Sequence, residues 1–305
     1  MLARLSAFSP ALRRQAAPRC LSAAAFSLTQ RVYIEHTDAF DVVFYANLFR
    51  FAAHGRESAL SLVAGAAPEG RFVLTSVDNA RLSDPASLGD LLTVTTELVG
   101  HESHLLLLKH TVAGEAASPK PHLVFYATAG FVNAAGALQP LPTRVLEQAP
   151  ALATVSARPF PLPLLHPPFA STTVVRPYAD ELGPGGSPSE VDFLRWMERS
   201  RTDALGALDG GLRSLQESGT FVVVTRVALR VDPAQACAAR VASGDVVMRC
   251  TARARSVFIE FAQEAVNAGG GVMAAAEVTC VCVDAATKRL RPPPDSLRKL
   301  FSVGL

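Results

Sequence analysis

Cysteine is scarce in this sequence. The 305 residues contain five cysteines, an odd number, and no two of them form a CxxC pair. A closed disulfide framework is therefore not expected, and a reducing compartment fits best. Cys280 and Cys282 would share one face of a strand, where buried thiols are a simpler interpretation than a metal site. We predict no metal and no cofactor.

Long hydrophobic runs and an excess of charge are also missing. The apolar stretch at 42–55 is interrupted by Asn47, Arg50 and His54, so it falls short of the roughly 20 residues that span a bilayer. Lys and Arg total 29 against 27 Asp and Glu, which leaves no basic excess of the kind that nucleic acids bind. We expect no membrane span and no nucleic-acid partner. At 305 residues the chain is long enough for two globular domains.

Acidic residues are absent from the N-terminus until Glu35. Residues 1–30 carry serines, many alanines and four arginines at positions 4, 13, 14 and 19. This composition is typical of an organellar transit peptide, mitochondrial or alternatively plastid, and a secretory signal fits the spread of arginines less well. We exclude residues 1–30 from the expected fold.

Proline is concentrated between the two halves of the chain. The run PFPLPLLHPPF at 159–169 disfavours regular structure, because each proline removes a backbone donor and biases the residue before it toward extended geometry. We predict a linker over 148–170 between domains at 31–147 and 171–305.

The two predicted domains resemble each other after a shift of 145 positions. Residues 47–60 and 192–205 align, with Arg50 and Arg56 recurring as Arg195 and Arg201. Both segments show the spacing of a helix. Each is followed by about four stretches with the alternation of strands, so the sequence predicts an α+β fold in which each long helix packs on a curved antiparallel sheet.

Residues 37–51, TDAFDVVFYANLFRF, carry a family resemblance. They are similar to the opening of the central helix in the 4-hydroxybenzoyl-CoA thioesterase family of hotdog proteins, with matches at Asp38, Val42, Val43, Phe44, Tyr45 and Asn47. The resemblance extends over 32–305 and implies two hotdog domains in tandem. It also implies hydrolysis of an acyl-CoA or acyl-carrier thioester, with self-association of the double unit as a further option.

The resemblance assigns roles to the residues before and within the first helical turn. Asp38 would attack the thioester or activate water, and the backbone N–H of Tyr45 would stabilise the oxyanion. Asn47 would fix the start of the helix or position water. The substrate would lie against the stretch formed by Asp41, Val42, Val43 and Phe44.

Two departures from the family pattern weigh against activity. Asp41 stands where the family has glycine, and it either intrudes on the oxyanion site or points outward at the helix start. In the second half, Gly183 aligns with Asp38, and Glu190 and Asp192 align with Tyr45 and Asn47. The alternative function is therefore a catalytically silent hotdog protein that serves as a binding or structural subunit of an organellar complex.

Overall fold

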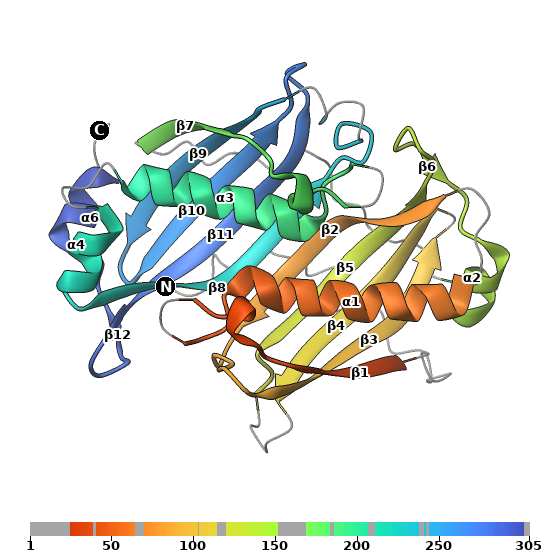
Figure 1. Cartoon of the computed structure of the whole chain (residues 1–305), viewed down its shortest axis with the longest axis horizontal. Coiled ribbons are helices and arrows are strands. Elements are labelled where there is room, and N and C mark those ends of the chain that lie inside the picture. The colour runs from red at the N-terminus through yellow and green to blue at the C-terminus, as the bar shows by residue number, and fades with distance from the viewer. Residues whose placement is uncertain are drawn as a thin grey trace.

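The computed structural model describes residues 25–38, 41–64, 70–102, 104–114, 120–151, 169–183, 186–206, 211–237, 241 and 244–301. Within these residues, twelve strands form one continuous antiparallel sheet, and two long helices cross one face of it (Figure 1). This is an α+β fold, as the sequence predicts.

The N-terminal half contains one long helix and six strands. They are β1 (Ala25–Arg31), η2 (Ile34–His36), α1 (Tyr45–Ala64), β2 (Arg71–Leu82), β3 (Leu91–Glu102), β4 (Leu105–Gly114), β5 (Leu123–Val132), β6 (Leu138–Gln139) and α2 (Thr143–Gln148).

The C-terminal half repeats this arrangement. Its elements are β7 (Phe169–Val175), η3 (Ala179–Glu181), α3 (Glu190–Leu205), α4 (Gly211–Glu217), β8 (Thr220–Val231), β9 (Val246–Arg255), β10 (Phe258–Val266), β11 (Val272–Asp284), β12 (Leu290–Arg291) and α6 (Asp295–Leu300).

The strand order is symmetric about the centre of the sheet. It runs β1-β3-β4-β5-β2 in the first half and continues β8-β11-β10-β9-β7 in the second, so the two halves join where β2 pairs with β8. Arg230 of β8 is buried at this junction, donates to the carbonyl of Val77 at 3.2 Å and forms an ion pair with Asp78.

Each long helix buries one face against the sheet of its own half. In α1, Phe49 and Phe51 are almost fully buried, and Gly55 allows close approach to β3, because an added Cβ would lie 2.8 Å from a methyl group of Val94. In α3, Phe193 and Trp196 are fully buried. The helical spacing at 47–60 and 192–205 is thus confirmed, and β3 buries every second residue, as an alternating strand should.

The first strand begins earlier than predicted. β1 pairs with β3 from Ala25 opposite Glu97 to Arg31 opposite Leu91, so residues 25–30 belong to the sheet rather than to a segment outside the fold. Phe26 and Leu28 alternate and pack against the core, a signal that the acid-free composition of the N-terminus obscured. The predicted linker at 148–170 is too long at both ends, because Gln148 belongs to α2 and β7 begins at Phe169. Residues 152–168 of that stretch lie outside the described residues.

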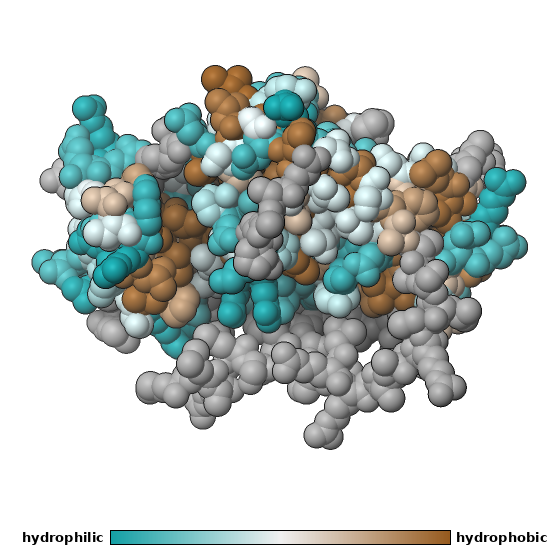
Figure 2. All heavy atoms as spheres, turned by 90° about the horizontal axis from the view of Figure 1, so that it is seen from below, coloured by the Kyte–Doolittle hydropathy of each residue, from teal (hydrophilic) through white to brown (hydrophobic). Residues whose placement is uncertain are grey.

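Exposed apolar side chains are dispersed over the surface. The residues more than half exposed include Tyr33, Ile34, Leu62, Val174 and Tyr178. On the face seen in Figure 2, apolar residues form separate groups among hydrophilic ones. None of the described helices is both long and apolar enough to cross a membrane.

Candidate active site

The start of α1 is held by hydrogen bonds to one carbonyl group. The N–H of Phe44 donates to the carbonyl of His36 at 3.0 Å, and Asn47 Nδ2 donates to the same oxygen at 2.9 Å. Asn47 is buried, and its Oδ1 accepts from Arg195 Nη2 at 3.3 Å. The Tyr45 N–H occupies the first position of α1, where a helix leaves N–H groups without intrahelical acceptors and has its positive dipole end.

Asp38 and Asp41 lie in a tight turn between η2 and α1. The N–H of Asp38 donates to the carbonyl of Val42 at 2.8 Å, and the N–H of Asp41 donates to the carbonyl of Asp38 at 3.2 Å. Asp41 has φ of +58°, the left-handed region that glycine adopts most readily and that Asp tolerates better than most other residues. Asp41 is exposed, whereas Asp38 is half-buried.

The three residues after Asp41 anchor the turn to the neighbouring loop. Val42 forms an isolated bridge with Ser87, and the N–H of buried Val43 donates to the carbonyl of Ala86 at 2.8 Å. The Phe44 ring packs edge-on against Tyr45, with 4.9 Å between ring centroids. These contacts position the backbone at the start of α1.

The same turn recurs before α3 without its carboxylate. The N–H of Gly183 donates to the carbonyl of Ser187 at 3.1 Å, and the N–H of Gly186 donates to the carbonyl of Gly183 at 2.9 Å. Gly186 has φ of +74° and lies 145 positions after Asp41. The shift found in the sequence therefore holds in the backbone geometry, with Gly183 in the place of Asp38.

An arginine side chain on each long helix contacts a residue at the start of the other long helix. Arg201 Nη2 donates to the hydroxyl of Tyr45 at 2.6 Å, and that hydroxyl donates to the carbonyl of Leu194 at 2.9 Å. Arg56 Nη2 lies 2.5 Å from Glu190 Oε1 in a buried ion pair. Burial raises the pKa of the Tyr45 phenol, so its ring stays a neutral link between the helices.

Sequence reasoning missed these crosswise contacts. The sequence shows that Arg56 recurs as Arg201 and that Tyr45 aligns with Glu190. It gives no indication that Arg56 contacts Glu190 or that Arg201 contacts Tyr45. The Tyr45 ring therefore joins the two halves, in addition to the role expected of its backbone N–H.

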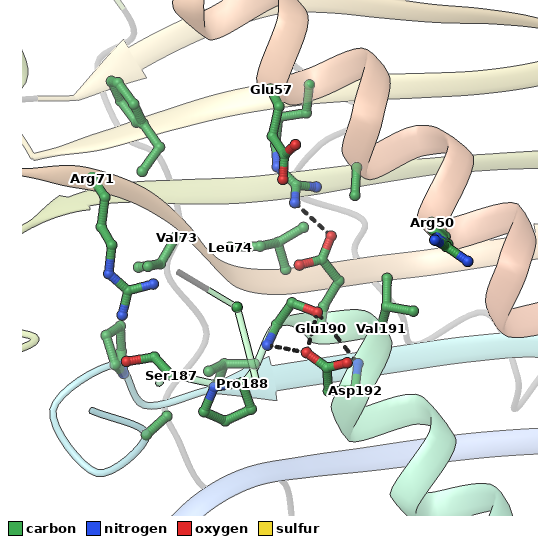
Figure 3. A pocket seen from close by; sticks show the side chains of 18 of the residues that line it. Arg50, Glu57, Arg71, Val73, Leu74, Ser187, Pro188, Glu190, Val191 and Asp192 are labelled. Atoms are coloured by element: carbon green, nitrogen blue, oxygen red, sulfur yellow. Dashed lines mark hydrogen bonds and ion pairs between the residues drawn. The ribbon is translucent and has the colours of Figure 1, made fainter. Parts of the chain in front are cut away.

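A cavity of about 420 Å³ opens at the start of α3. Its walls include parts of α1, the beginning of β2, Gly183, residues 187–189 and the first turn of α3 (Figure 3). Gly183 lines it, whereas Asp38, Tyr45 and Asn47 do not. The predicted site residues Asp38, Tyr45 and Asn47 thus lie together in the turn before α1 and its first helical turn. The cavity is lined instead by the residues that align with them in the second half, Gly183, Glu190 and Asp192.

Four carboxylates and several cations line the cavity. The carboxylates are Glu57, Asp180, Glu190 and Asp192, and the arginines are Arg50, Arg56, Arg71 and Arg195. In Figure 3, Glu190 reaches from the start of α3 toward α1, and Asp192 folds back beside the same helix start. Burial raises the pKa of Asp192 to about 6, against the effect of hydrogen bonds from Ser189. Across the described residues, no cluster of three or more His, Cys, Asp or Glu is placed to hold a metal ion.

The sequence matches no model of a known protein family and no curated protein sequence. Solved structures are similar in fold over most of the chain. A suggested oleoyl thioesterase from Lactobacillus plantarum superposes with a TM-score of 0.67 at 8% identity, covering 86% of this chain and 97% of its own.

Two acyl-carrier-protein thioesterases superpose in the same way. The 12:0-ACP thioesterase from Umbellularia californica gives a TM-score of 0.65 at 10% identity, over 85% of this chain and 94% of its own. An acyl-ACP thioesterase from Bacteroides thetaiotaomicron gives 0.59 at 10% identity, over 84% and 97%. At these identities the similarity shows the fold alone, and it is the hotdog fold that the sequence resemblance implied.

Proposed function

We propose that this protein hydrolyses acyl thioesters carried by coenzyme A or by an acyl-carrier protein. The observation that carries the proposal is the fold: similar structures named as thioesterases match across both halves of the chain. The motif at 37–51 supports it, since Asp38 lies in the turn before α1 and Tyr45 and Asn47 lie in its first turn.

Asp38 supplies the carboxylate in this proposal, as nucleophile or general base. The Tyr45 N–H donates to the oxyanion, aided by the positive end of the α1 dipole. Asn47 holds the helix start through its bond to the His36 carbonyl. The exposure and positive φ of Asp41 support the outward orientation, in which its charge does not oppose the oxyanion.

We also propose that the chain comprises two hotdog units paired within one molecule. The sequence predicts them at 31–147 and 171–305, and the strands and helices extend them to 25–148 and 169–305. The mirrored strand order and the repeated turn support this division. Association of these double units and import into mitochondria, or alternatively plastids, are parts of the same proposal. Because β1 begins at Ala25, an import signal would have to be removed before that residue, which N-terminal sequencing of the protein from isolated organelles tests.

The alternative is a silent subunit that binds a thioester without hydrolysing it. One observation favours it: the 420 Å³ cavity opens where Gly183 replaces the carboxylate. If Asp38 were also inactive, the protein would bind a thioester in this cavity without hydrolysing it.

Thiol release from a panel of acyl-CoAs and acyl-carrier thioesters decides between the two functions. The Asp38→Asn change keeps the shape and removes the charge, so kcat should fall at least about a hundredfold with little change in Tm. Asp203→Asn, at an exposed position in the last turn of α3, is the matched control and should leave kcat unchanged. If the parent protein bound these thioesters tightly but released no thiol, the enzyme proposal would be rejected in favour of the silent subunit.

A further inference from the structure

We infer that the cavity at the start of α3 is a second acyl-thioester site, in which Asp192 is the general base. The inference rests on the proposed function and assigns a catalytic group to the half whose motif is degraded. Gly183 has no side chain to place a carboxylate in this cavity, so any base must come from another element.

Elimination among the four lining carboxylates leaves Asp192. Glu57 and Asp180 are exposed and have the solvation of ordinary surface acids. Glu190 is buried, but its Oε1 is engaged in an ion pair with Arg56 Nη2 at 2.5 Å. Asp192 is 7% exposed and, among the described residues, lies within 4.0 Å of no cationic nitrogen.

Hydrogen bonds position the Asp192 carboxylate. Its Oδ2 accepts from the N–H of Ser189 at 2.7 Å and from the Ser189 hydroxyl at 2.6 Å. A carboxylate held in this way retains lone pairs for a water molecule. Burial raises the pKa of Asp192 to about 6, which leaves the group ionised at neutral pH and more basic than an ordinary aspartate.

The same cavity offers donors for an oxyanion. The N–H of Glu190 is the first of α3 and corresponds to that of Tyr45 after the shift of 145, so this donor survives the loss of the side-chain motif. Arg56 also lines the cavity with a side chain only 8% exposed, and its Nη1 has no hydrogen-bond partner within the described part of the chain. A buried guanidinium nitrogen in that condition requires an acceptor, which a ligand carbonyl provides.

The reaction is an ordinary hydrolysis. Asp192 takes a proton from water as the water oxygen bonds to the thioester carbonyl carbon, and the carbonyl electron pair moves to oxygen. When the carbonyl re-forms, the C–S bond breaks and its electron pair goes to sulfur. The sulfur takes the proton from Asp192, so a carboxylic acid and a free thiol leave and the base is restored.

Several charged groups surround Asp192 and can affect a pH profile. They are Glu190 and Arg195 on α3, Arg50, His54, Arg56 and Glu57 on α1, Asp180 on η3 and Arg71 on β2. His54 is the one imidazole among these lining groups. His54→Gln is therefore a necessary comparison.

The test measures thiol release by the full chain between about pH 4.5 and 8, in the parent and in Asp38→Asn, Asp192→Asn and the double variant. Asp38→Asn should retain at most about a hundredth of the parent activity, and this remainder should rise through an apparent pKa of about 6. Adding Asp192→Asn should lower this activity at least about a hundredfold. His54→Gln should leave the rising limb in place.

Ser189→Ala separates catalysis from helix capping. It removes a hydroxyl that lowers the pKa of Asp192, so the limb should move to higher pH while activity persists. If Asp192 has only a structural role, Ser189→Ala and Asp192→Asn should lower Tm by similar amounts and leave the rising limb of the pH profile where it is.

The remaining outcomes distinguish the two proposals. An Asp38→Asn variant with no activity left, or with a remainder that Asp192→Asn does not lower further, overturns the second site and leaves the proposed function standing. Loss in Asp192→Asn with no effect of Asp38→Asn supports the second site and removes Asp38 from the mechanism. A parent that releases thiol from none of the acyl-CoAs and acyl-carrier thioesters overturns both.

Discussion

The ion pair between Arg56 and Glu190 should be the most sensitive point of contact between the two halves. Its side chains are 8% and 4% exposed, and its atoms are 2.5 Å apart. Removing one partner leaves an unpaired charge in a site with little water, which typically costs about 3–5 kcal/mol of unfolding free energy. Glu190→Gln and Arg56→Met should each fall in that range in urea-induced unfolding.

The double variant tests whether the unpaired charge is the cause. With both charges removed, no buried ion is left, so Arg56→Met with Glu190→Gln should cost less than either single change. Glu217→Gln is the control, because the Arg213–Glu217 pair is largely exposed and i,i+4 pairs of that kind contribute about 0.5 kcal/mol or less. Single changes that lower the unfolding free energy by less than about 1 kcal/mol would refute this reasoning, and so would a double variant that is less stable than both single variants.

Two further predictions concern His110 and Asp41. Burial, and then the charge of Arg56, hold the pKa of His110 well below its ordinary value, so the unfolded chain binds a proton near pH 6.5 that the folded protein refuses. Stability present above that pH should be lost as the pH falls below it, and His110→Gln should flatten the decline in urea midpoint between about pH 6.5 and 5; an unchanged slope would contradict this. At Asp41, the positive φ predicts that Asp41→Gly changes the unfolding free energy by less than about 1 kcal/mol, whereas Asp41→Val costs about 1–2 kcal/mol. Equal losses in the two variants would show that the carboxylate, rather than the backbone, is what the position needs.

Much of the fold could be predicted from residue spacing. Helical periodicity at 47–60 and 192–205 and alternation in the flanking stretches specify α1, α3 and the strands, because each pattern depends on near neighbours in the chain. The glycine at 186 and the aspartate at 41 mark the same turn, since both residues tolerate positive φ. Composition was a poorer guide at the N-terminus, where the alternation of Phe26 and Leu28 placed β1 within a stretch that lacks acids.

Only the tertiary structure decided what surrounds the two helix starts. Arg56 and Glu190 are 134 positions apart, and Arg201 and Tyr45 are 156 apart. Their contacts exist because β2 pairs with β8 and brings the two helices together on one face. The same packing opens the cavity at the start of α3 and buries Asp192 within it. Sequence can identify a carboxylate near a helix start, but its desolvation and its partners depend on which surfaces meet when the two halves pack.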